Sequence, residues 1–130
     1  MKIESGLLYS KNDEWVRVEG DTAVIGITDY AQGQLSDIVF AEVSIDEGES
    51  VEAGDCIGTV ESVKAASDIY TPVTGTVAAV NTAIADTPEL INKDAFGEAW
   101  FIKVTLEGPI AGDELMDAAA YEKYCAEREH

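Results

Sequence analysis

Histidine, cysteine and long apolar runs are scarce in this chain of 130 residues, and each scarcity excludes a class of function. The one histidine, His130, is the last residue, so we expect no Ser-His-Asp or Cys-His catalytic arrangement and no His-rich zinc site within one chain. The two cysteines, Cys56 and Cys125, form no CxxC pair, which is typical of reduced thiols in a cytosolic compartment. We therefore expect no metal site.

Long apolar segments are also missing. No window approaches the roughly 18 apolar residues that indicate a transmembrane helix, so we expect none. The first residues contain one lysine and a very short apolar run, which is typical of neither a signal peptide nor an Arg-rich transit peptide. The expected location is the bacterial cytoplasm.

Basic residues are few. Eight lysines and arginines stand against 26 acids, which gives a formal net charge of −18 at pH 7. This balance argues against nucleic acid as a partner, because phosphate contacts need clustered Lys and Arg, and it argues equally against anionic membranes. Copies of such a chain repel one another, so we expect a monomer that attracts basic protein partners.

Recognisable catalytic sets are missing as well. The chain contains neither a Walker loop nor a GxGxxG fingerprint. Acidic pairs such as Asp46-Glu47 and Asp113-Glu114 are expected from the composition, and solvated surface is their simplest interpretation. We therefore expect a non-catalytic protein that carries something or is acted on.

Short apolar, β-branched runs separated by turn signals predict an all-β fold with short helices. Residues 14–18 and 22–27 flank the turn Glu19-Gly20-Asp21 and predict a hairpin. Further strands are predicted at 37–43, 56–63, 68–73, 76–80 and 99–106, with Pro72 at an edge or bend.

Three segments have the pattern of helices. Thr28-Asp29 is expected to cap a short helix over 30–35, and Thr87-Pro88 to start another that ends near Asn92. A longer helix is expected over about 113–127, because its first turn is acidic and basic residues lie near its end. With no linker in sight, residues 1–130 are predicted to form a single domain with a core of about 7–108 and this helix at its C-terminal end.

Lysine is scarce, and of the six lysines only Lys64 lies between two strand-like runs, at the apex of a predicted hairpin. Small residues follow it, which leaves its side chain unobstructed. On the residues alone, an ordinary exposed hairpin lysine is the simpler interpretation and a modified lysine is the alternative.

The segment Glu61-Ser62-Val63-Lys64-Ala65, with Ser67-Asp68 after it, resembles the lipoyl-attachment hairpin of the glycine cleavage system H-protein family. Other motifs along about residues 7–128 are also similar to that family: Glu14-Trp15-Val16, Gly26-Ile27-Thr28-Asp29-Tyr30-Ala31-Gln32, Asp37-Ile38-Val39-Phe40, Pro72-Val73-Thr74-Gly75 and Gly97-Glu98-Ala99-Trp100. One position departs from it, because the family commonly has a histidine immediately before Glu-Trp and this chain has Asp13.

The resemblance implies an all-β, lipoyl-domain-like barrel-sandwich hybrid with short helices and a C-terminal α-helix. It implies that lipoic acid is bound covalently to Lys64 as lipoyl-lysine, and that the chain is a carrier of the glycine cleavage system. Such a carrier moves the methylamine group of glycine from one enzyme to the next, and the tether gives each encounter a high effective concentration.

The implied partners are the pyridoxal-phosphate glycine decarboxylase, the tetrahydrofolate-dependent aminomethyltransferase and the FAD-dependent dihydrolipoamide dehydrogenase. A lipoate ligase, or a lipoyl or octanoyl transferase, is implied as the modifying enzyme, and basic patches are expected on the partner enzymes.

The resemblance also assigns roles to residues around Lys64. Glu61, Val63 and Ala65 are the expected recognition positions for the modifying enzyme. Glu14 and Asp68 match family positions near the resting groove of the arm, and we expect them to hold the ammonium of the cargo and shield it from water. Ordinary solvent-facing acids are the alternative for this pair.

Other carriers remain as alternatives. A lipoyl domain of a 2-oxo acid dehydrogenase shares the hairpin lysine but is usually tethered to a catalytic domain. A biotin carrier usually has methionine on both sides of its lysine, whereas here the flanking residues are Val63 and Ala65. An H-like protein that donates lipoyl groups to other enzymes is the third alternative.

Overall fold

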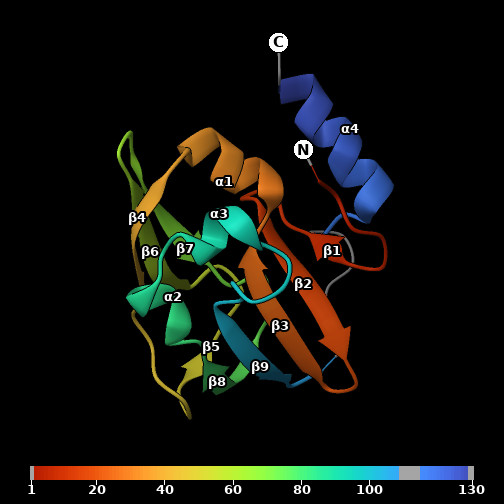
Figure 1. Ribbon diagram of the computed structural model, residues 1–130. Helices are drawn as coiled ribbons and strands as arrows, with labels where there is room; N and C mark the ends of the chain where they lie inside the picture. The colour runs from red at the N-terminus through yellow and green to blue at the C-terminus, as the bar shows by residue number, and fades with distance from the viewer. Residues whose placement is uncertain (1, 109–114, 129–130) are drawn as a thin grey trace.

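The computed structural model describes residues 2–108 and 115–128, in which two antiparallel β-sheets dominate (Figure 1). The larger sheet has six strands in the order β1-β2-β3-β9-β8-β5, and the smaller has three in the order β4-β6-β7. The strands are β1 (Leu8–Tyr9), β2 (Glu14–Glu19), β3 (Thr22–Ile27), β4 (Ile38–Val43), β5 (Ser50–Val51), β6 (Cys56–Ser62), β7 (Ala66–Tyr70), β8 (Gly75–Val80) and β9 (Ile102–Leu106). This mostly-β architecture confirms the predicted fold class.

The predicted hairpin between β2 and β3 is present, with Trp15 paired to Gly26. A side chain at position 26 would collide with the indole of Trp15, because an added Cβ would lie 2.7 Å from two ring carbons. The indole N–H donates to the carbonyl oxygen of Ala95 at 2.8 Å. This close packing fixes the start of β2, where Glu14 lies.

In the part of the chain that the structure describes, four helices connect or cover the strands: α1 (Asp29–Leu35), α2 (Ala83–Asp86), α3 (Leu90–Lys93) and α4 (Ala118–Arg128). Thr28 caps α1 as predicted, since its hydroxyl oxygen accepts from the backbone N–H of Ala31 at 3.1 Å. The other end of α1 lies beside the tip of the β6–β7 hairpin (Figure 1). This helix therefore borders the segment that contains Lys64.

The C-terminal helix begins later than expected. Positions 113 and 114 of the predicted helix lie outside the described residues, and α4 begins only at Ala118. Met116 instead pairs with Tyr9, and the two residues exchange backbone hydrogen bonds of 2.7 and 2.8 Å. Asp117 then caps the helix, because its Oδ1 accepts from the N–H of Ala120 at 2.9 Å. The local charge pattern behind the predicted helix does not indicate this strand-like contact.

Two apolar clusters hold the structure together. The larger one draws on strands of both sheets and on Ile84 and Ile91 of the short helices. The smaller one lies under α4, where the ring of Tyr121 stacks on that of Tyr9 with centroids 4.5 Å apart, and Cys125 is fully buried. Within the described residues, no helix is long and apolar enough to cross a membrane.

Candidate functional site

The β6–β7 hairpin ends in a tight turn with Val63 and Lys64 at its tip (Figure 1). The backbone N–H of Ser62 donates to the carbonyl oxygen of Ala65 at 2.7 Å. The hydroxyl oxygen of Ser62 accepts from the N–H groups of Lys64 at 3.1 Å and of Ala65 at 2.9 Å. A serine that satisfies two turn N–H groups holds the tip in one conformation, so the backbone of Lys64 is fixed while its side chain is exposed.

The amine of Lys64 points toward α1, where its Nζ lies 3.5 Å from the carbonyl oxygen of Gln34. Within the described residues, neither of the two ion pairs involves Lys64. The side chain of Lys64 therefore presents an accessible amine beside the C-terminal end of α1.

The expected recognition positions surround this amine. Glu61, Val63 and Ala65 are all exposed, and the side chain of Val63 is 74% exposed. The backbone N–H of Val63 also donates to the carbonyl oxygen of Asp37 at 3.3 Å, which ties the turn to the residue before β4. The structure thus gathers these positions at one tip, and their roles remain predictions.

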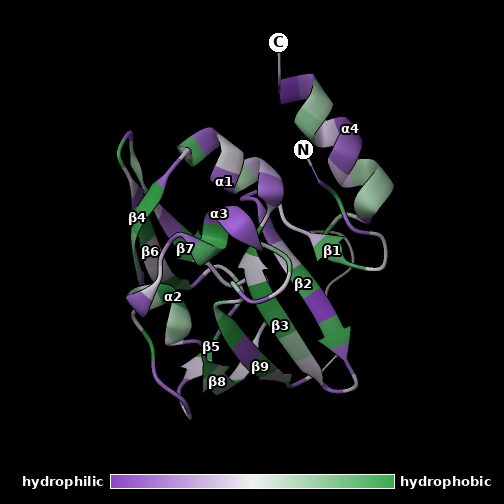
Figure 2. Ribbon diagram, viewed as in Figure 1, coloured by the Kyte–Doolittle hydropathy of each residue, from purple (hydrophilic) through white to green (hydrophobic). Residues whose placement is uncertain are grey.

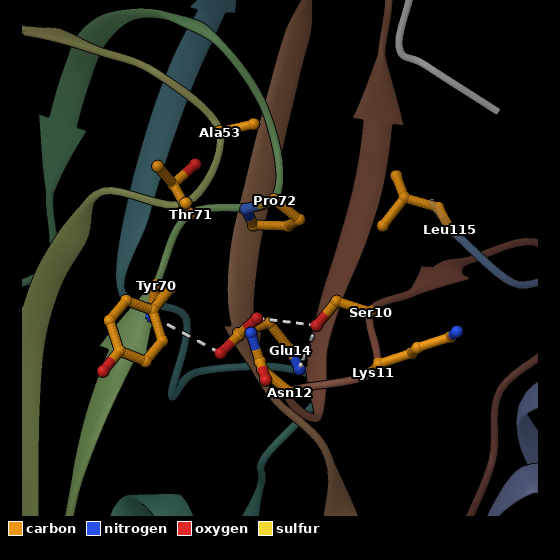
Figure 3. A pocket seen from close by; sticks show the side chains of 10 residues that line it. Ser10, Lys11, Asn12, Glu14, Ala53, Tyr70, Thr71, Pro72 and Leu115 are labelled. Carbon is orange, nitrogen blue, oxygen red and sulfur yellow. Dashed lines mark hydrogen bonds between the residues drawn. The ribbon is translucent and has the colours of Figure 1, made fainter. Parts of the chain in front are cut away.

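Glu14 lies elsewhere, at the start of β2, and is only 1% exposed. The hydroxyl of Ser10 donates to its Oε1 at 2.6 Å, and the backbone N–H of Tyr70 donates to its Oε2 at 3.4 Å (Figure 3). The backbone N–H of Glu14 donates in turn to the hydroxyl oxygen of Ser10 at 3.0 Å. The carboxyl group is thus held between two segments that are distant in sequence.

Burial raises the pKa of Glu14 to about 7, although hydrogen bonds from Ser10 and Tyr70 favour the charged form. The nearby charge of Asp13 raises it further. Near neutral pH this side chain therefore changes protonation state easily, and a cation beside it would favour the carboxylate.

A cavity of about 390 Å³ opens at Glu14, and a hollow of about 150 Å³ shares the lining residue Asn12 with it. The cavity is lined by Ser10, Lys11, Asn12, Glu14, Ala53, Gly54, Tyr70, Thr71, Pro72 and Leu115 (Figure 3). The hollow is lined by Asn12, Asp13, Ile27, Ala31, Gln34, Leu35, Ser67 and Ile69. Asn12 borders both spaces, and Gln34 borders the hollow and contacts Lys64, so the hollow is next to the cavity on one side and close to the lysine on the other.

Asp68 does not join Glu14 in this cavity. Its neighbours Ser67 and Ile69 line the hollow, and successive residues of a strand point to opposite faces, so Asp68 points away from it. Its Oδ1 instead accepts from the hydroxyl of Thr59 on the neighbouring strand at 3.2 Å, and the residue is exposed. The structure therefore does not bring Asp68 and Glu14 together, and the expected role of each carboxylate remains a prediction.

Asp13, at the position where the resemblance leads us to expect a histidine, fastens α4 to the loop before Glu14. Its carboxylate accepts from Arg128 at 2.6 Å and from the hydroxyl of Tyr121 at 2.9 Å. The backbone of Asp13 has a φ of +69°, a conformation that few residues other than glycine adopt. The guanidinium of Arg128 also lies 4.2 Å from the ring centroid of Tyr30 and 4.3 Å from that of Tyr124.

The sequence-based interpretation missed several residues of the cavity. Ser10 and Tyr70 hold the Glu14 carboxyl group, and Asn12 and Gln34 line the hollow beside its cavity. The polar run after Ser10 was a usable signal, because residues such as Asn12 favour a turn, and a turn there brings Ser10 back to Glu14. No comparable signal marks Tyr70, which comes from a strand 56 residues away.

Comparison with known proteins gives a consistent result. A family model described as "Glycine cleavage H-protein" matches residues 7–128. A "Glycine cleavage system H protein" of Thermoanaerobacter sp. (strain X514) is 52% identical over 127 residues, which cover 98% of this chain and 99% of the relative. A protein of the same name from Syntrophomonas wolfei is 52% identical and covers 96% of this chain and 95% of its own length.

A solved structure is similar throughout its length. The crystal structure of a glycine cleavage system H protein from Mycobacterium marinum superposes with a TM-score of 0.85 at 34% sequence identity. The match covers 94% of this chain and 98% of that one. The arrangement of the two sheets, the hairpin and the short helices is therefore shared with an experimentally determined fold.

Proposed function

The chain belongs to the glycine cleavage H-protein family and is a lipoyl carrier of the glycine cleavage system, and on this premise we propose that Lys64 is its attachment residue. The observation that carries this proposal is the exposed Lys64 amine on a turn whose backbone is fixed by Ser62. An enzyme that modifies one lysine among six needs such a defined target. The lipoyl group, when bound, supplies the dithiolane that accepts and releases the cargo.

Attachment is an acyl transfer onto the Lys64 nitrogen. The amine, once neutral, forms a C–N bond with the carbonyl carbon of an activated acyl donor and loses a proton. The bond from that carbon to the donor's leaving group, an adenylate phosphate or a thiol, breaks with its electron pair. No electrons are exchanged with an oxidant or reductant, so the side chain ends as a neutral amide.

We propose that Glu14, rather than Asp68, receives the cationic end of the cargo. A methylamine group is a primary ammonium near neutral pH, and Glu14 is a buried carboxyl group in the cavity that adjoins the hollow near Lys64. An ammonium in this buried place lowers the pKa of Glu14 below about 7 and forms an ion pair with little competing water. The cavity then shields the cargo from solvent.

Membership of this family also supports the identity of the enzymes that this carrier serves. It receives its cargo from the glycine decarboxylase, delivers it to the aminomethyltransferase and is reoxidised by dihydrolipoamide dehydrogenase, without catalysing a reaction itself. A lipoate ligase or an octanoyl transferase modifies Lys64. The net charge of −18 supports a monomer and steered encounters with basic surfaces. The bacterial sources of the relatives support a cytoplasmic location.

Intact-protein mass spectrometry tests the attachment site. After incubation with a lipoate ligase, lipoate and ATP, we expect one lipoyl-sized gain in mass, located on Lys64 by peptide mapping. Lys64→Ala should gain nothing, and Lys103→Ala, which alters a lysine of β9, should gain as the original chain does. Modification of another lysine, or none in the original chain, would overturn the assignment.

The role of Glu14 is tested by the lifetime of the loaded cargo in the lipoylated protein. Glu14→Gln should speed non-enzymatic loss of methylamine, because a neutral amide cannot pair with the ammonium. Asp68→Asn should have a smaller effect, since Asp68 lines neither the cavity nor the hollow. An unchanged lifetime in Glu14→Gln would refute the role.

A further inference from the structure

Exposed apolar side chains gather beside the Lys64 turn. The described residues contain four large hydrophobic side chains that are exposed, and three of them belong to this region: Val39 at 57%, Phe40 at 41% and Val63 at 74%. The bond from the N–H of Val63 to the carbonyl oxygen of Asp37 brings the turn next to the start of β4. Figure 2 shows the hydrophobic colour of this part of β4 next to the hairpin.

A β-bulge explains why two consecutive residues of β4 are exposed. A regular strand would turn one of Val39 and Phe40 toward the core. The register between β4 and β6 shifts at this point, so that Ile38 pairs with Ser62 while Phe40 pairs with Glu61, and Val39 has no partner. Bulges often redirect side chains near functional sites. Here the bulge displays both apolar side chains within reach of the attachment turn.

Acidic residues surround this apolar group on the outer face of the smaller sheet. The register places Phe40, Glu61 and Ala66 in one row across the three strands. The next row contains Glu42, Thr59 and Asp68. Glu42, Glu61 and Asp68 are exposed, and none of them takes part in either ion pair found in the described residues. The face therefore combines an apolar edge with three unneutralised carboxylates.

We propose that this face, formed by Val39, Phe40, Glu42, Glu61 and Asp68, is the docking surface for the enzyme that acylates Lys64. This inference rests on the proposed attachment at Lys64. The complementary surface on the acylating enzyme would be an apolar recess with Lys or Arg side chains at its rim. It would lie next to that enzyme's acyl-transfer site. It also gives Asp68 a role in recognition of the partner instead of in binding of the cargo.

Geometry favours the acylating enzyme over other occupants. Before acylation the reactive atom is the Lys64 Nζ itself, so this enzyme must cover the turn and the surface next to it. Enzymes that act later are reached by a longer arm and need not touch β4. A second copy of this chain brings the same acidic face and a net charge of −18, so electrostatics oppose self-association.

Acylation kinetics of the apo chain test the proposal, with a lipoate ligase, lipoate and ATP as the probe. The double variant Val39→Ser and Phe40→Ser should raise KM about tenfold and leave kcat unchanged, because these side chains would contribute to docking and not to the acyl transfer. The dissociation constant for the ligase, measured by biolayer interferometry, should rise by the same factor. Glu42→Gln with Asp68→Asn should slow association and reduce its dependence on salt.

Two controls separate the possible outcomes. Val18→Ser removes the fourth exposed apolar side chain, which is 46% exposed on β2, and Glu122→Gln removes an exposed charge on α4. Both should be acylated as the original chain is. If the original chain is acylated at Lys64 and the double variant has the same KM and dissociation constant, the docking surface is refuted while the attachment site stands.

Two other results would also overturn the assigned occupant. One is normal acylation of the double variant combined with slower turnover by the glycine decarboxylase, which would assign the face to a later partner. The other is a dimer of the original chain in sedimentation velocity that the double variant loses. Absence of acylation in the original chain would instead refute the proposed attachment itself.

Discussion

Replacing Glu14 by glutamine is expected to stabilise the protein above neutral pH, although the substitution removes a proposed functional group. The carboxyl group is 1% exposed and has one short hydrogen bond, from Ser10, and one long one, from Tyr70. Glutamine has nearly the same shape and stays neutral at every pH. The variant therefore isolates the free-energy cost of burying the charge.

The magnitude follows from the pKa. Burial raises it from the usual 4.5 to about 7, so the folded state binds this proton more tightly than the unfolded state. The corresponding stabilisation is fully present below pH 4.5 and is lost as the pH rises through 7. The loss amounts to about 3 kcal/mol. The Glu14→Gln variant should match the original chain near pH 4.5 and exceed its stability by up to that amount at pH 8.

Thermal unfolding followed by circular dichroism between pH 4.5 and 8 measures this difference. For a domain of this size, about 3 kcal/mol corresponds to a rise in Tm of roughly 10 °C at pH 8. Glu122→Gln, at an exposed position of α4, should show no comparable pH-dependent difference. A Tm difference for Glu14→Gln that is the same at every pH would refute the raised pKa and the cost of burying this carboxylate.

Three further substitutions test the structure around the site. Ser62→Ala leaves two turn N–H groups without their acceptor and should slow acylation severalfold while lowering the free energy of unfolding by about 1 kcal/mol, as kinetics and urea denaturation would measure. Gly58→Ala should lower the free energy of unfolding by more than about 2 kcal/mol in the same urea denaturation, because the added Cβ would collide with the carbonyl oxygen of Glu42. A free energy of unfolding close to that of the original chain would contradict this packing. Arg128→Gln should lower the free energy of unfolding by about 2 kcal/mol, because it breaks the ion pair with Asp13. In a double-mutant cycle with Asp13→Asn, the two changes in this free energy should be coupled, and additive changes would contradict the ion pair.

The turn that contains Lys64 was the part of the candidate site that the sequence predicted best. Its signal is local, because two strand-like runs flank a short segment with one lysine and small residues after it. The observed strands, Cys56–Ser62 and Ala66–Tyr70, place Lys64 in the turn as predicted. The hairpin of residues 14–18 and 22–27 and the helix capped by Thr28 were predictable for the same reason.

The protonation state of Glu14 was not predictable from its neighbours in sequence. Glu14 precedes Trp15 in a polar segment, where an acid is usually exposed. It is buried because Tyr70 and the segment around Pro72, more than fifty residues away, close over it. Long-range packing of this kind decides the pKa and leaves no periodic pattern in the chain.

The face of the sheet to which a strand residue points was also not predictable from the sequence. The resemblance implies that Asp68 lies near the arm, and the role of this residue stays a prediction. In the structure, the register of β7 turns the Asp68 side chain to the outer face of the sheet, opposite Ser67 and Ile69. The short elements β1, β5 and α2 were also missed, because two to four residues are too few for a pattern to show. The predicted strand 68–73 begins and ends earlier, since Pro72 falls in the bend that follows Tyr70.

The bulge in β4 has a consequence for the behaviour of the protein at high concentration. β4 is an edge strand, and an unpaired edge with apolar side chains is a template on which another chain can add as a further strand. The bulge interrupts the regular spacing of its backbone groups, and the side chain of Asn92 accepts from the N–H of Ile38 at 2.8 Å. The same irregularity that displays Val39 and Phe40 thus protects the chain against edge-to-edge aggregation.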